Sequence, residues 1–264
     1  MSPTALRWCA LPLGLLGFAL RLAVTFWLQP LTWRLSPASG LLVMAGGIVV
    51  AVAIPFGIFW LLTGGVRRRP NHFAWSNGRF TVPASPLYAG SQAMMWMFLS
   101  GGAVFTERVP NGDRMRMAEF DFTWPATVIG VGVFWVVAFA FLLVQRPQLH
   151  LDSGGLAIRR VWRTTEIAWG DLAPGGPVPP VKRRTRRLRL YLNRAPVLGR
   201  YVASEDVPIG WLHVEPAFLA RAIRHYVEHP QDRAAIGTEE GLRQLRAAVG
   251  ASDPATARTP AHLP

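Results

Sequence analysis

The sequence predicts a membrane α-helical bundle of about four spans, followed by a small antiparallel β barrel or sandwich capped by a C-terminal helix. Three observations predict this fold class. Long uncharged apolar runs fill residues 1–144 of the 264-residue chain. Charged residues make up only 16% of the chain, whereas soluble domains carry about 25%. After residue 145 the apolar residues first alternate as in β-strands and then recur with the period of a helix.

Four segments are expected to cross the membrane, because an apolar stretch of about 18 or more residues can span the hydrocarbon core. They cover residues 9–33, 41–63, 87–106 and 124–144. Arg21 interrupts the first span, and we expect it to snorkel toward the interface; a functional intramembrane charge is the alternative. Arg7 before an apolar stretch also resembles a signal peptide, but no convincing Ala-x-Ala cleavage site follows, which favours an uncleaved span.

The distribution of basic residues predicts the orientation. One side of the membrane receives Arg7, the triplet 67–69, Arg79 and the basic C-terminal half, while the other receives Arg34 and the nearly balanced loop 107–123. Both termini are therefore expected to be cytoplasmic, in a multi-pass protein of the cell inner (plasma) membrane. The net charge of +13 is weak evidence for a nucleic-acid or anionic partner, because part of it reflects a composition rich in arginine. Lys182 is the only lysine, and all other basic residues are arginine.

Small residues four apart predict close helix contacts. The pairs are Gly47 with Ala51 and Ala126 with Gly130. We expect them to pack helices within one chain, with a homodimer seam as the alternative.

The C-terminal half, residues 145–230, is expected to be a separate cytoplasmic domain. The predicted strands are 148–151, 156–162, 165–169 and the run to Leu192 in which Leu188 and Leu190 share one face, with weaker candidates at 197–203 and 207–209. A helix should begin at Pro216 and end before Pro230. A short helical extension is expected over 231–250, with Thr238 as its N-cap, and a disordered tail over 251–264. Residues 71–86 predict a hairpin around Asn77-Gly78, packed on this domain or lying at the interface.

The stretch LHLDSGGLAIRRVWRTTEIAWGDL resembles the opening of a bacterial PH-like (bPH) domain, with Ile167, Trp169, Asp171 and Leu172 forming the Ile-x-Trp-x-Asp-Leu element. The stretch AFLARAIRHYVEHPQDRAAIGTEEGL is similar to the end of actinobacterial integral membrane proteins that carry this domain. The resemblance covers roughly residues 147–245, and the membrane half matches by layout only. It implies two nearly orthogonal antiparallel sheets capped by a C-terminal helix, and a scaffold or assembly module with no general ligand and no established catalytic activity. The sequence itself does not establish a phosphoinositide-binding site, so we do not expect one from the resemblance.

The densest basic run is the candidate binding site. It comprises Lys182, Arg183, Arg184, Arg186, Arg187 and Arg189. Each basic residue near an anionic leaflet contributes about 1 kcal/mol of attraction, so this run is expected to bind anionic lipid headgroups or a protein partner. A solvated strand face is the alternative. Nucleic acid is not an expected partner, because no aromatic platform or groove-reading helix accompanies the run.

Motifs for catalysis and metal binding are weak. His225-Tyr226-Val227-Glu228-His229 matches H-x-x-E-H, but Pro230 follows at once, so an exposed helix end is expected instead of a metal site. The chain has one cysteine, Cys9, and no phosphate-binding loop or nucleophile elbow. The outer loop 107–124 mixes arginines with acids and is expected to be a connector, with a ligand or ion site as the alternative. We therefore expect no catalytic residue, no metal and no cofactor.

These observations together predict a non-enzymatic, membrane-anchored scaffold that binds a protein partner or the anionic inner leaflet, either alone or as a homo-oligomer. The alternative is a subunit of a transporter or channel. That alternative needs polar residues facing the inside of the bundle, and the sequence offers only Arg21, Gln92 and Ser100.

Overall fold

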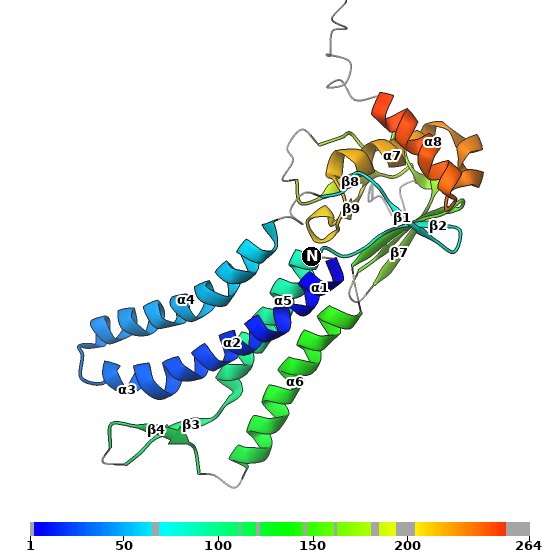
Figure 1. The fold of residues 1–264 in the computed structure, drawn as a ribbon. Coiled ribbons are helices and arrows are strands. Elements are labelled where there is room, and N and C mark those ends of the chain that lie inside the picture. The colour runs from blue at the N-terminus through cyan, green and yellow to red at the C-terminus, as the bar shows by residue number, and fades with distance from the viewer. Residues whose placement is uncertain are drawn as a thin grey trace, which may run out of the picture. The chain divides into compact units, whose positions relative to one another are not determined.

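The computed structural model describes residues 3–64, 69–110, 112–119, 122–144, 147–160, 163–180, 185–193 and 204–251. Several residues with predicted roles lie outside this part of the chain: Arg67, Arg68, Asp121, Trp162, Lys182, Arg183, Arg184, the strand candidate 197–203 and the tail from residue 252. The chain divides into two compact units (Figure 1). Unit 1 comprises Met1–Arg67 and Pro86–Gln145, and unit 2 comprises Arg68–Ser85 and Arg146–Pro264.

Unit 1 is a helical bundle with a small hairpin at one end. Its elements are α1 (Pro3–Trp8), α2 (Ala10–Ala23), the π-helical turn η1 (Val24–Leu28), α3 (Gln29–Thr32), α4 (Pro37–Leu62), α5 (Pro86–Ser100), the 3-10 turn η3 (Gly101–Ala103), the antiparallel strands β3 (Thr106–Arg108) and β4 (Met115–Met117), and α6 (Thr123–Leu143). Among the described residues, three helical segments are long and apolar enough to cross a membrane, namely Ala5–Thr32, Pro37–Leu62 and Thr123–Leu143. They correspond to three of the four predicted spans.

The remaining predicted span, 87–106, is shorter in the structure. The α-helix of 15 residues ends at Ser100, because Gly101 and Gly102 follow and glycine is a poor helix former. The chain then turns through η3 and enters β3 at Thr106. α5 lies in the interior of the bundle, where Ala89, Ala93 and Met97 have no exposed surface.

Small residues allow the helices of unit 1 to approach closely. A Cβ atom on Gly47 would lie 2.2 Å from the Leu28 side chain, and Ala51 on the same helix is buried. Gly130 faces Ala103, since a Cβ atom on Gly130 would lie 3.1 Å from the Ala103 Cβ. Gly47, Ala51 and Gly130 thus pack against residues of the same chain.

The described strands of unit 2 form two antiparallel sheets. The five-stranded sheet has the order β1-β2-β5-β6-β7, and the two-stranded sheet pairs β8 with β9. The strands are β1 (Ala74–Ser76), β2 (Arg79–Val82), β5 (Gln148–Leu151), β6 (Gly155–Arg159), β7 (Thr164–Ala168), β8 (Leu188–Tyr191) and β9 (Ser204–Val207). A bridge between Leu172 and Leu192 links the end of the first sheet to the second. The described strands do not close into a barrel, because β1 and β7 remain the two edges of the large sheet.

The hairpin β1–β2 belongs to the large sheet although α5 and α6 separate it from β5 in the sequence. Phe80 pairs with Leu151 and Val82 with Leu149. Asn77 and Gly78 form the turn with φ of 52° and 69°, as expected of a type I′ hairpin. The predicted hairpin is therefore confirmed, and of its two predicted positions the structure shows packing within unit 2.

Helices cover the apolar face of this sheet. The helical elements of unit 2 are η4 (Trp169–Asp171), η5 (Ile209–Trp211), α7 (Pro216–Glu228), η6 (Pro230–Ala235) and α8 (Glu239–Ala251). α7 buries Phe218, Leu219 and Ile223 in the core it shares with the strands. α8 begins as predicted, since Thr238 Oγ1 accepts a hydrogen bond from the Gly241 amide at 2.9 Å. Its side chains Leu242 and Leu245 also join the core, because their spacing places both on one helix face.

Trp169 links the C-terminal segment to the large sheet. Trp169 is buried and its Nε1 donates to the Asp152 carbonyl at 2.8 Å. Arg233 lies over the Trp169 ring, 5.6 Å from its centre, and its Nε donates to the Tyr226 carbonyl at 2.7 Å. These contacts hold the end of α7 against the sheet. Trp169 is therefore part of the core of unit 2.

Candidate functional site

The arginine face consists of Arg186, Arg187 and Arg189, the members of the predicted basic run that the structure describes. Leu188 and Leu190 of β8 point into the core, so the alternating side chain of Arg189 points to solvent. The side chains of Arg187 and Arg189 are 76% and 62% exposed. The alternation predicted for this strand is confirmed.

One carboxylate lies against two of these arginines. Asp206 of β9 is the register partner of Arg189, and its oxygens lie 3.6 Å from Arg187 Nη1 and 3.5 Å from Arg189 Nε. Both contacts are solvent-exposed and longer than a good hydrogen bond, so each contributes little to stability. The guanidinium groups therefore remain accessible to an anionic surface.

The arginine face lies beside the point at which the chain leaves unit 2. The Arg186 carbonyl accepts a hydrogen bond from the Gly210 amide at 2.9 Å, and the next residue, Trp211, accepts one from the Ser85 amide at 2.7 Å. α5 begins one residue later, at Pro86. We call residues 83–85 and the turn η5 the exit edge. The sequence alone does not show this proximity, because more than 100 residues separate Ser85 from Arg186.

The histidines of the H-x-x-E-H pattern stack on each other instead of converging on a metal. The two rings are 4.6 Å apart, His225 Nε2 lies 2.9 Å from Asp232 Oδ2, and the intervening Glu228 pairs with Arg224. Burial lowers the pKa of His225, and Asp232 opposes this shift. Within the described ranges no cluster of three or more His, Cys, Asp or Glu side chains could hold a metal ion.

The outer loop 107–124 forms the hairpin β3–β4 and a network of ion pairs. Asp113 binds Arg34 and also lies 3.5 Å from Arg108, whose guanidinium stacks 4.2 Å above the Trp33 ring. The hydrogen bond from Arg34 lowers the pKa of the Asp113 carboxyl. These contacts join the hairpin to the end of α3, so the loop is more ordered than the predicted connector.

A second network joins the two strands of the hairpin. Arg116 binds both Glu107 and Glu119, at 2.8 Å and 2.7 Å.

Two polar residues that a transport pathway would need are engaged locally. Arg21 Nη1 donates to Thr25 Oγ1 at 3.4 Å, and the Arg21 stem lies against Gly101. Ser100 Oγ donates to the Met97 carbonyl at 2.6 Å and accepts from Trp135 Nε1 at 3.1 Å. Both side chains are therefore hydrogen-bonded within unit 1.

Comparison with protein-family models, with curated proteins and with solved structures finds no match.

Proposed function

We propose that this protein is a non-enzymatic, membrane-anchored scaffold whose unit 2 docks on the anionic inner leaflet through the arginine face. The observation that carries this proposal is the short hydrogen-bonded path from Arg186 through η5 to Ser85, after which the chain enters α5. A basic surface at the exit edge is well placed to meet lipid headgroups. The transporter or channel alternative has less support, because Arg21 and Ser100 bond to their own bundle.

Sheet pairing supports a specific membrane topology for the proposal. β2 and β5 are neighbouring strands, so residues 79–82 and 148–151 must lie on the same side of the membrane. If α6 crosses the bilayer, the chain must cross a second time between them, and α5 with η3 is the available segment. At rises of 1.5 and 2.0 Å per residue these two elements reach about 28 Å, close to the ~30 Å hydrocarbon core.

The number of crossings also determines on which side of the membrane each end of the chain lies. With α4 and the Ala5–Thr32 segment also crossing, four crossings place the N-terminus on the side of unit 2. The triplet 67–69 and the basic C-terminal half then share that side, which the positive-inside rule makes cytoplasmic. The proposed location is therefore the inner (plasma) membrane, with both termini in the cytoplasm.

We further propose that unit 2 is a PH-like domain. Two antiparallel sheets followed by the C-terminal helix α7 are what the resemblance of residues 147–245 implies. The β1–β2 hairpin would be an addition to that region, contributed from between the membrane helices. A PH-like domain without a general ligand fits a docking role better than a catalytic one.

Hydrogen exchange of the full-length protein in lipid nanodiscs tests the docking proposal. Amides of residues 173–187 should exchange more slowly in discs containing phosphatidylglycerol than in discs of phosphatidylcholine alone, and added salt should remove the difference. Reversing Arg183, Arg184, Arg186 and Arg187 to Glu should abolish the protection. Because the predicted attraction is about 1 kcal/mol per residue, the effect should grow with each reversal.

A matched control separates this site from total charge. Arg243 and Arg246 lie on the exposed face of α8, and reversing both should leave the protection unchanged, whereas reversing only Arg186 and Arg187 should reduce it. Equal exchange in both kinds of disc would contradict leaflet docking. A protein captured only by the wild-type arginine face in a crosslinking pulldown would then favour a protein partner, and ion flux in proteoliposomes would favour the transporter alternative.

A further inference from the structure

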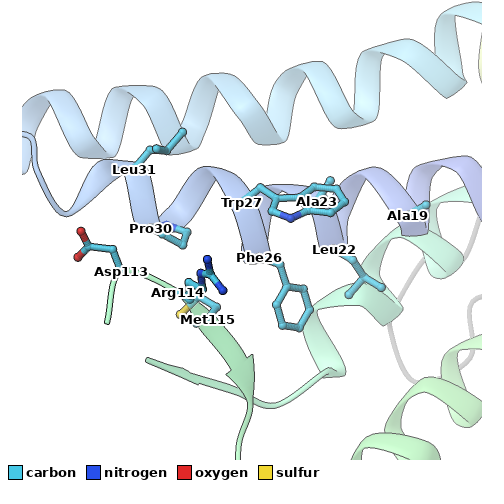
Figure 2. Close-up of a pocket in the computed structure, with 10 residues that line it drawn as sticks. All are labelled: Ala19, Leu22, Ala23, Phe26, Trp27, Pro30, Leu31, Asp113, Arg114 and Met115. Carbon is cyan, nitrogen blue, oxygen red and sulfur yellow. The ribbon is translucent and has the colours of Figure 1, made fainter. Parts of the chain in front are cut away.

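A groove lies between the N-terminal helix of unit 1 and the β3–β4 hairpin (Figure 2). Its volume is about 800 Å³. One wall is apolar and is formed by the helix, with Ala19, Leu22, Ala23, Phe26 and Pro30 among its residues. The hairpin forms the other wall with Asp113, Arg114 and Met115, and Figure 2 shows Arg114 and Met115 opposite the helix. The groove therefore combines a long apolar surface with a cation.

The apolar wall is one continuous face of the helix. Its residues recur at i, i+3, i+4, i+7 and i+11, and they extend roughly 17 Å along the axis. Ala19 and Ala23 alternate with the larger Leu22 and Phe26 along this face, and we call the lower surface at the two alanines the trough. The opposite face packs in the bundle, where Gly14 contacts Met97. Within the described residues, the bundle helices therefore leave this wall available to a ligand.

The helix changes its hydrogen bonding at the groove. Residues 24–28 form the π-helical turn η1, and the Gln29 amide donates to the Val24 carbonyl, five residues back. Such turns are rare and frequently occur at functional sites. Here the turn directs Phe26 and Trp27 to the groove, and Pro30 follows it. The widened turn is thus part of the groove wall itself.

Arg114 differs from the other arginines at this end of unit 1. Arg34, Arg108 and Arg116 each bind a carboxylate. The structure shows no ion pair for Arg114 with any described residue, and the carboxylate beside it in the sequence is engaged by Arg34 and Arg108. In Figure 2 the guanidinium of Arg114 extends from the hairpin toward the helix wall between Pro30 and Phe26. Its charge is available to an anion in the groove.

We propose that this groove binds one anionic lipid of the surrounding bilayer. An acyl chain would lie along the trough at Ala19 and Ala23, and the phosphate of the headgroup would bind Arg114. A small polar molecule would leave the apolar wall uncovered, and an uncharged hydrocarbon would leave Arg114 without a counter-ion. Trp27 and Trp33 at the same end of the helix are typical of the headgroup region. This site is independent of the arginine face of unit 2.

Native mass spectrometry of the full-length protein tests the proposal. The detergent-solubilised chain is titrated with phosphatidylglycerol or phosphatidylcholine of identical acyl chains. The first phosphatidylglycerol should bind about tenfold more tightly, and Arg114→Gln should remove that preference. Arg114→Lys should retain most of it. Ala23→Trp fills the trough and should weaken the first binding event for both lipids.

Two control variants match these changes. Arg116→Gln removes the same charge from an arginine held by two glutamates, and Ile129→Trp adds the same bulk at an exposed position of α6. Neither should change the first binding event. Equal affinity for the two lipids in the wild type would overturn the proposal, as would an equal loss in Arg114→Gln and Arg116→Gln. If Ala23→Trp dissociates a dimer without affecting lipid binding, a second copy occupies the groove and the proposal is wrong. Because Arg114 and Ala23 approach the groove from opposite walls, misfolding of one variant leaves the other as a test.

Discussion

Truncating Phe80 should destabilise unit 2 although this residue lies between α4 and α5 of unit 1 in the sequence. Phe80 is fully buried, its ring centre is 5.7 Å from that of Phe73, and Phe73 lies 5.0 Å from Phe218 of α7. Phe→Ala substitutions in such cores cost about 3–5 kcal/mol. Since a whole domain is stable by only about 5–15 kcal/mol, Phe80→Ala should remove a large part of the stability of unit 2.

Hydrogen exchange of the full-length protein in detergent measures this effect separately for each unit. Amides of β5, β6 and α7 should exchange about 10²–10³-fold faster in Phe80→Ala, because each 1.4 kcal/mol changes the opening equilibrium tenfold. Amides of α6 should be unchanged. Trp75→Ala is the matched control, since this aromatic residue of the same hairpin is 52% exposed and its loss should cost about 1 kcal/mol or less. Wild-type exchange of β5 and α7 in Phe80→Ala would show that the hairpin is not part of the core.

Two further predictions concern unit 2. Gly237→Ala should accelerate exchange at the tip of the β1–β2 hairpin, since φ at Gly237 is +86° and a Cβ there would lie 2.0 Å from the Gly78 backbone carbon; unchanged exchange would refute the contact. Unit 2 should also lose stability as the pH falls below about 6.5. Burial lowers the pKa of His150, His213 and His225 below the value of about 6.5 that a histidine has in the unfolded chain. The unfolded chain therefore binds more protons than the folded chain in that range, which favours unfolding. The loss of stability should not exceed about 1.4 kcal/mol per pH unit for each histidine, and His150→Gln should reduce the loss. A stability of unit 2 that rises on acidification, measured by hydrogen exchange, would contradict the prediction.

Local patterns in the sequence predicted the elements whose signals are local. The alternation of Leu188 and Leu190, the turn residues Asn77 and Gly78, and the cap at Thr238 each depend on a few neighbouring residues. The apolar runs likewise predicted the three long helices. In each case the physical cause, a period, a positive φ or a hydrogen bond, acts within about four residues.

The tertiary partners of these elements were not predictable in the same way. Phe80 and Val82 show that β2 has an apolar face, but nothing near them indicates that the face pairs with β5. The groove at Arg114 is equally hidden, because it depends on the contact of Asp113 with Arg34, 79 residues away. Arg114 differs from Arg34, Arg108 and Arg116 because the fold brings a carboxylate to each of those three arginines.

The interleaving of the two units has a consequence for biosynthesis. The ribosome delivers β1 and β2 before α5 and α6, and the rest of unit 2 only afterwards. If α5 and α6 both cross the membrane as proposed, the early β1–β2 hairpin waits without its β5 neighbour while the translocation machinery inserts these two helices. If that helix pair inserted with only one crossing, the late strands would emerge in the wrong compartment and the sheet could never be completed. On the proposed topology, completion of the large sheet of unit 2 is thus a checkpoint on correct insertion, because a misinserted chain would leave the β2 edge without β5.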